Sequence, residues 1–157
     1  MHKRGYSSIE LLLAISILVL SCSLVIPMIG NATQSSLNDA KRLLVSDIEL
    51  AQSIAIAQPE DGIILVIQED RWHIALEDTP DTPIRNKING EPIQTICGVG
   101  PAISAQDVRL ATNLDKQTIS FNHHGGINLF SGFAEVTLSL DSQTDIVTIH
   151  PITGWIE

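Results

Sequence analysis

The sequence predicts an α+β fold, with a long N-terminal transmembrane helix packed against a small antiparallel β-sandwich head. Three observations predict it. Residues 11–29 form a run in which 15 of 19 side chains are apolar and none is charged. Apolar residues then recur at helical spacing as far as residue 58. Beyond residue 59, short apolar runs alternate with turn residues in the manner of antiparallel strands.

The apolar run at 11–29 has the length of a membrane span. As a helix it would be about 28 Å long, close to the ~30 Å hydrocarbon thickness of a bilayer. Lys3 and Arg4 precede the run, and the next basic residue is Lys41. By the positive-inside rule, we expect the N-terminus to stay in the cytoplasm and the chain beyond about residue 30 to be exported.

Three interpretations of this segment are open. It fits a plain signal anchor. It also fits a cleaved secretory signal, because Gly30-Asn31-Ala32 has the small-x-small form that signal peptidase accepts, although the run exceeds the usual ~7–15 residue core. The third interpretation starts from Glu10, a carboxylate at the edge of the run. An ionised group there costs a few kcal/mol unless it finds a partner, so a functional role is expected.

A second helical stretch follows directly. From about residue 32 to residue 58, apolar residues recur at steps of three and four and form one stripe. Pro59 and Gly62 end the pattern. We therefore expect one helix from about Ser7 to Gln58, bent near Pro27 because proline lacks an N–H. The stripe consists of Leu37, Ala40, Leu44, Ile48, Ala51, Ile54 and Ala55.

The remainder of the chain predicts short antiparallel strands that form a small β-sandwich or a curled sheet on the helix. Glu69-Asp70 suits a hairpin turn, and the prolines and glycine of residues 77–93 suit a long loop. The expected strands are 63–68, 71–76, 94–97, 108–111, 118–122, 133–140, 146–150 and 154–156.

The first residues carry a recognisable pattern. The chain opens Met-His-Lys-Arg-Gly, followed by Tyr6 and then Glu10. This start resembles the class III signal of type IV pilins and type II secretion pseudopilins, in which prepilin peptidase cuts after Gly and methylates the new N-terminus. The resemblance implies cleavage after Gly5, methylation of Tyr6 and an assembly role for Glu10, the fifth residue of the mature chain. Pro27 matches a proline common in pilin-like helices.

The globular part resembles the GspH/FimT family of minor pseudopilins and minor pilins. The segment 50–56 is similar to that family's helix end, although Gln52 stands where Arg is common. Arg71-Trp72 falls where the family often has a strand Trp. Phe121 and Gly125 resemble its Phe-x-x-x-Gly turn, and 149–156 resembles its last hairpin. The resemblance covers nearly the whole chain.

This resemblance implies a pilin-like fold and a structural subunit rather than an enzyme. The resemblance divides the chain into a prepilin leader at 1–5, a helix at 6–58 with the transmembrane segment 11–29, and a periplasmic head at 59–157. The implied function is that of a type II secretion minor pseudopilin near the tip of the periplasmic pseudopilus. The alternatives are a FimT-like minor pilin that primes type IV pilus assembly and a soluble periplasmic binding module.

The same resemblance implies the location and the partners. A bacterial inner-membrane protein with a single span is expected, with its N-terminus in the cytoplasm and its head in the periplasm. Its partners would be other major and minor pseudopilins, prepilin peptidase and the inner-membrane assembly platform.

The charge balance argues against a nucleic-acid partner. The formal net charge is −9, and residues beyond 30 carry 17 acidic and 7 basic side chains. Such a chain repels phosphate. With 44% hydrophobic residues and only 2 Cys, the chain is also too apolar for a disordered protein and too poor in cysteine for a disulfide scaffold.

No cofactor or metal site is expected. Two adjacent histidines do not supply a tetrahedral site by themselves, so His123 and His124 are predicted as turn residues, with His73 or His150 as the partners of a less favoured metal site. The acidic stretch Asp78–Pro83 lacks the regular ligand spacing of a calcium loop. We expect the lone exported thiol, Cys97, to be buried rather than paired between molecules. Trp72 and Trp155 are predicted to pack against the sheet.

Overall fold

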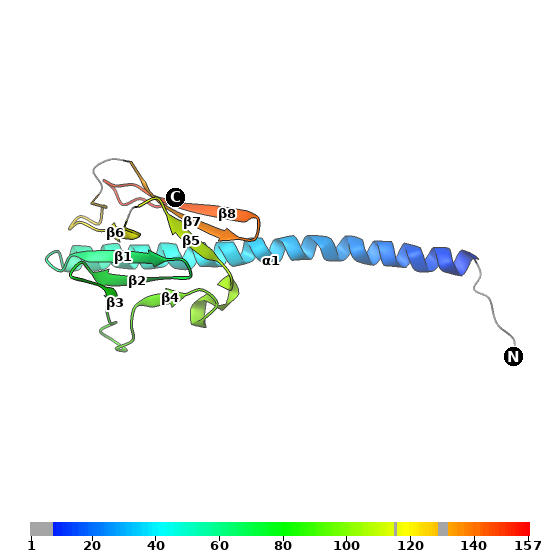
Figure 1. Cartoon of the computed structure of the whole chain (residues 1–157), viewed down its shortest axis with the longest axis horizontal. Helices are drawn as coiled ribbons and strands as arrows, with labels where there is room; N and C mark the ends of the chain where they lie inside the picture. The colour runs from blue at the N-terminus through cyan, green and yellow to red at the C-terminus, as the bar shows by residue number, and fades with distance from the viewer. Residues whose placement is uncertain (1–7, 115, 129–131) are drawn as a thin grey trace.

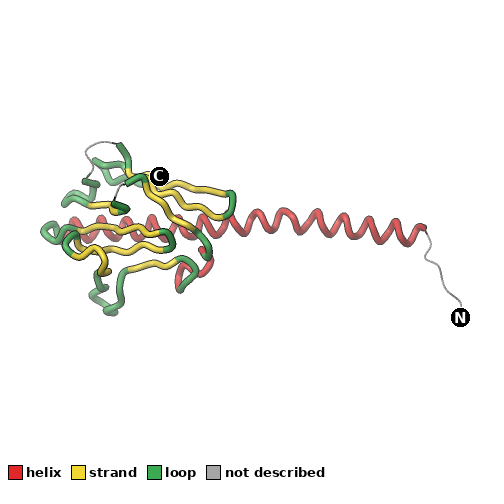
Figure 2. The backbone as a smooth tube through the Cα atoms, viewed as in Figure 1, coloured by secondary structure: helices red, strands yellow, loops and turns green. Residues whose placement is uncertain are grey.

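The structure is a computed structural model that describes residues 8–114, 116–128 and 132–157, with side chains described outside residues 22–31. Gly5 and Tyr6 lie outside the described residues. The described chain is a long helix with two antiparallel sheets and a short 3₁₀ helix placed along one part of it. Figure 2 shows the strands gathered over one end of the helix, so that the other end projects.

Helix α1 (Ser8–Ala57) accounts for both predicted helical stretches. It is helical without a break, and Figure 1 shows it as one nearly straight rod. The predicted bend near Pro27 is therefore wrong at the level of the backbone. Proline removes a single backbone hydrogen bond, and here the hydrogen bonds of the flanking turns keep the helical path. The side chain of Pro27 lies outside the described residues.

The predicted apolar stripe of α1 is confirmed as the centre of the hydrophobic core. Five of its residues are fully buried and Ala55 is nearly so. Full burial of one Leu or Ile side chain stabilises a fold by roughly 1.5–3 kcal/mol, so this stripe attaches the head firmly to the helix. The fully buried members are Leu37, Ala40, Leu44, Ile48 and Ala51.

The first sheet contains the predicted hairpin. Strands β1 (Ile63–Gln68) and β2 (Arg71–Leu76) pair across the turn at residues 69–70. The sheet has the order β3-β2-β1-β6, and β4 also pairs with β2. Both faces of β1 are buried, which explains its continuous apolar run. The other strands are β3 (Thr79–Pro83), β4 (Gln94–Ile96) and β6 (Thr118–Ser120).

The second sheet has three strands in the order β5-β7-β8. Strand β5 (Arg109–Thr112) and strand β8 (Gln143–Ile149) flank β7 (Ala134–Leu140). In β7, Ala134, Val136 and Leu138 are fully buried and alternate with more exposed residues, as the predicted alternation requires. Both sheets contact α1.

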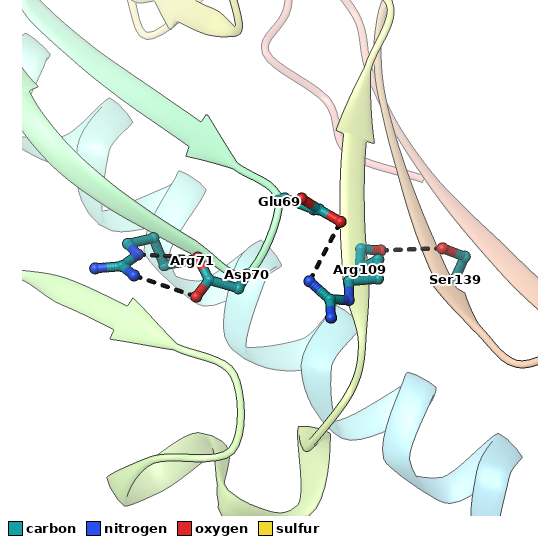
Figure 3. Close-up of polar contacts among 5 residues, drawn as sticks. All are labelled: Glu69, Asp70, Arg71, Arg109 and Ser139. Carbon is teal, nitrogen blue, oxygen red and sulfur yellow. Dashed lines mark hydrogen bonds and ion pairs between the residues drawn. The ribbon is translucent and has the colours of Figure 1, made fainter.

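The tip of the β1–β2 hairpin in the first sheet lies against β5, an edge strand of the second sheet (Figure 3). There the Leu110 N–H donates to the Glu69 carbonyl oxygen at 2.8 Å, and Arg109 forms an ion pair with the Glu69 carboxylate at 3.2 Å. Beside them, Arg71 binds Asp70, and this hydrogen bond holds the pKa of the Asp70 carboxyl below its usual value. The head is therefore a pair of sheets curled along the helix, and α1 fills the position of the second sheet in the predicted sandwich.

Three local predictions need correction. The expected loop at 77–93 contains β3, an edge strand whose two prolines hid it from sequence patterns but are tolerated at a sheet edge. The 3₁₀ helix at Gly100–Ala105 was not predicted. The expected strand at 154–156 is reduced to one bridge between Ile149 and Ile156.

Candidate functional site

The start of α1, at residues 8–21, carries large apolar side chains on every side. We call residues 8–21 the stalk. Large apolar side chains follow one another around it, and each is more than half exposed, from 55% for Ile15 to 73% for Ile9. An amphipathic helix would show one apolar face, so a helix that is apolar all round requires a partner that surrounds it. The exposed residues are Ile9, Leu11, Leu12, Leu13, Ile15, Ile17, Leu18, Val19 and Leu20.

The serine hydroxyls of the stalk do not weaken its apolar character. Ser16 Oγ donates to the Leu12 carbonyl oxygen, and Ser21 Oγ donates to the Ile17 carbonyl oxygen, both at 2.8 Å. Each hydroxyl is thus satisfied by the carbonyl one turn back, which is how serine is accommodated where water is excluded. The hydroxyls of Ser16 and Ser21 therefore need no outside partner.

Glu10 is the one charged residue in the stalk sequence. It lies in the first turn of α1 and its side chain is exposed. The positive end of the helix dipole favours a carboxylate at this position, but only by a fraction of a kcal/mol to about 1 kcal/mol. When the apolar surroundings of Glu10 become covered, its charge needs a cation as well.

Within the described residues, no helix meets the length and hydropathy of a membrane-crossing helix. The predicted span at 11–29 includes residues 22–29, whose side chains lie outside the described residues.

A groove lies along α1 where the helix meets the head. It has a volume of about 510 Å³ and is lined by α1 and one residue of β8. Lys41 closes one side through an ion pair with Asp145 of β8 at 3.0 Å. The groove is lined by Asn38, Lys41, Arg42, Val45, Ser46, Glu49 and Asp145.

The structure does not bring the predicted metal candidates together. His73 is buried on β2, where its Nε2 lies 2.8 Å from the Pro80 carbonyl oxygen. His123 and His124 lie in the turn after β6 with their rings 3.8 Å apart, and His150 lies beyond the end of β8. Among the residues described, no three His, Cys, Asp or Glu side chains are placed to hold a metal ion.

Two sets of polar contacts that the sequence does not reveal attach the head to α1. Asp47 Oδ2 accepts hydrogen bonds from Trp72 Nε1 and Thr95 Oγ1, both at 2.7 Å. Gln52 Nε2 donates to the Gly154 carbonyl oxygen at 2.8 Å. The first contact ties α1 to β2 and β4, and the second ties α1 to the last turn. No local signal could find either pair, because their members are 25 to 102 residues apart.

Cys97 is only partly buried and forms no disulfide in the described chain. Burial raises the pKa of its thiol to about 11. Because the thiolate is the reactive form, we expect alkylation of Cys97 by iodoacetamide to be much slower at neutral pH than that of a free cysteine, and to accelerate as the pH approaches 11. Mass spectrometry of a Cys22→Ser chain measures this rate. Alkylation as fast as that of free cysteine at neutral pH would contradict the expectation.

A comparison with solved structures identifies the fold. The chain superposes on the type IV minor pilin FimU of Pseudomonas aeruginosa strain PAO1 with a TM-score of 0.52. The match covers 81% of this chain and 87% of that one. The chain has a type IV pilin-like fold. At 13% identity the likeness shows this pilin-like fold alone. No family model and no curated protein matches the sequence.

The pilin-like fold agrees with the predicted fold class, a long N-terminal helix against an antiparallel β head. Of the predicted site residues, the structure places only Glu10 with its side chain, in the first turn of α1. Gly5, Tyr6 and the side chain of Pro27 lie outside the described residues.

Proposed function

We propose that the chain is a minor pseudopilin of a type II secretion system, a structural subunit of the periplasmic pseudopilus rather than an enzyme. One observation carries the proposal. A stalk that is apolar on every side bears a single carboxylate, Glu10, and projects from a head with a pilin-like fold. Such a stalk is stable when other apolar helices or lipid surround it. The proposed location is the inner membrane before assembly and the pseudopilus afterwards.

Glu10 supplies the selectivity of this packing. Cleavage after Gly5 would leave Tyr6 with a cationic amine, methylated in the proposed pathway. The amine of a neighbouring subunit would pair with Glu10, which offsets the desolvation of both charges. A lone subunit has no such neighbour, so the pair favours incorporation and fixes the axial position of one helix against the next. The proposed partners are other pseudopilins, prepilin peptidase and the assembly platform.

A FimT-like minor pilin that primes type IV pili is the second candidate, because the structural neighbour FimU is a type IV minor pilin. The acidity of this chain favours the secretion system over a DNA-binding pilus member. Its residues 117–157 contain no Lys or Arg. A surface of this kind gains nothing from phosphate contacts.

Intact-mass measurement of the chain from its native membrane tests the processing step. We expect a loss of residues 1–5 together with the gain of one methyl group. Gly5→Leu should leave the precursor uncut, because the peptidase would lose the small residue before its cleavage point.

The matched control is Gly30→Leu, which alters the small-x-small site of the secretory interpretation. This variant should be processed like the wild type. A mature chain that begins after Ala32, with cleavage blocked by Gly30→Leu and not by Gly5→Leu, would refute the proposal in favour of a soluble periplasmic module.

A further inference from the structure

The outer face of the β5-β7-β8 sheet carries an aromatic row that the core does not use. The register pairs Ala134 of β7 with Ile149 of β8, and both side chains are buried toward α1. Their neighbours Phe133 and His150 therefore project outward, because side chains alternate between the faces of a strand. The two rings form an edge-to-face pair with centroids 4.7 Å apart.

Trp155 lies beside His150 and extends this row. The His150 N–H donates to the Trp155 carbonyl oxygen at 2.9 Å, which sets the last segment beside β8. The indole of Trp155 is 64% exposed and Phe133 is 48% exposed. The prediction that Trp155 packs against the sheet is therefore wrong, whereas Trp72 is fully buried as predicted. Ile152, 89% exposed, adds an apolar side chain in the adjoining turn.

The turn that presents Trp155 is held rigidly. The Gly154 N–H donates to the His150 carbonyl oxygen at 2.9 Å, and Gln52 on α1 binds the Gly154 carbonyl oxygen. Gly154 has a φ of +66°, and a Cβ there would collide with the Gly125 carbonyl oxygen, so glycine is required. A turn backbone held by such contacts loses little conformational entropy when a partner binds.

Acidic side chains border the aromatic row. Glu157 and Thr148 exchange two backbone hydrogen bonds, and the Glu157 carboxylate lies 3.6 Å from His150 Nε2. Glu135, exposed on β7, pairs with Thr148 in the register and so lies on the same face. In Figure 1 the β7–β8 turn points toward the stalk, so the row lies at the opposite end of these strands.

We infer that this face is a docking site for a partner protein that presents a Lys- or Arg-containing segment with apolar neighbours. The face of an indole attracts cations, and flanking carboxylates strengthen that attraction. Of the four acidic side chains in residues 117–157, Glu135 and Glu157 border the row, whereas Asp145 pairs with Lys41 and Asp141 lies in the β7–β8 turn. A second copy of the chain, or an anionic lipid surface, would bring like charge to the same face. Trp is also among the residue types enriched at binding hot spots.

Fluorescence anisotropy with the full chain in neutral detergent tests this inference independently of the stalk. The probe is a fluorescein-labelled peptide of sequence Gly-Lys-Val-Arg-Val-Lys-Gly, and its control has Glu at each basic position. We expect the basic peptide to bind and the acidic peptide not to bind. Trp155→Ala should weaken binding by roughly tenfold or more. Trp155→Phe should retain part of the affinity, and added salt should weaken binding.

Ile88→Ala is the matched control, because Ile88 is 95% exposed but lies in the loop between β3 and β4. This variant should bind like the wild type. Glu157→Lys provides a second test if Trp155→Ala fails to fold, and it should abolish binding. Equal binding of both peptides, or unchanged binding by Trp155→Ala and Glu157→Lys, would overturn the inference. Trp155-dependent self-association or Trp155-dependent binding to phosphatidylglycerol vesicles, without peptide binding, would overturn it equally.

Discussion

Glu10→Ala is expected to abolish incorporation of the chain into a filament while leaving membrane insertion and processing intact. Glu10 is the single charge of an otherwise apolar stalk. Its removal makes the stalk more apolar, so insertion does not suffer, but the cationic amine of a neighbour then loses its counter-charge in an apolar setting. Leaving a buried charge unpaired costs about 3–5 kcal/mol, which corresponds to more than a hundredfold loss of incorporation. Sheared-filament fractionation with immunoblotting measures this loss.

The controls for this result separate charge from position. Glu60→Ala removes an exposed acidic side chain just after α1 and should assemble normally. Glu10→Asp keeps the charge on a shorter side chain and should assemble in part. Normal secretion and normal filament incorporation by Glu10→Ala would contradict the role proposed for Glu10.

Asp47→Ala is expected to lower the free energy of unfolding of the head by about 2–4 kcal/mol. The substitution leaves the Trp72 N–H and the Thr95 hydroxyl without the acceptor that both use at 2.7 Å. Trp72 is fully buried, and its indole N–H uses the half-buried Asp47 carboxylate as its acceptor. Each buried donor left unsatisfied costs about 1–3 kcal/mol. Thermal unfolding followed by near-ultraviolet circular dichroism measures the change.

Two control variants are compared with Asp47→Ala in the same unfolding measurement. Glu49→Ala changes an exposed acidic side chain two residues along α1, and its effect should stay within about 0.5 kcal/mol. Asp47→Asn keeps an acceptor oxygen and should recover part of the loss. A melting temperature for Asp47→Ala equal to that of Glu49→Ala would show that the contact contributes nothing to stability.

Apolar residues that repeat at helical or strand spacing in the sequence predict much of this fold correctly. The stripe from Leu37 to Ala51 repeats at helical spacing, so α1 and its buried face follow directly from it. The β1–β2 hairpin and the alternation of β7 are equally local. The side-by-side arrangement of the sheets was not predictable in this way, because it depends on contacts such as that between Glu69 and Leu110, 41 residues apart. Strand β3, with two prolines, has no apolar alternation to detect.

The residues of the candidate site differ in the same way: local patterns predict some of them, and contacts between distant residues determine the others. Glu10 could be found from sequence because a carboxylate in an apolar run is a local anomaly. The exposure of Trp155 could not be found, because it is decided by the pairing of its segment with β8 and by the tie from Gln52 to Gly154. Gly154 itself illustrates the limit, since a Cβ there would collide with the carbonyl oxygen of Gly125, 29 residues earlier in the chain.

Site-specific photocrosslinking from the stalk tests the central proposal most directly. A photoreactive residue at Leu13 or Ile17, both more than half exposed, would report what surrounds the stalk in assembled filaments. We expect crosslinks to the N-terminal helix of another pilin-like subunit, and their loss in the Glu10→Ala background. Crosslinks confined to lipid in the assembled state, unaffected by Glu10→Ala, would contradict the proposal that the stalk is the assembly element.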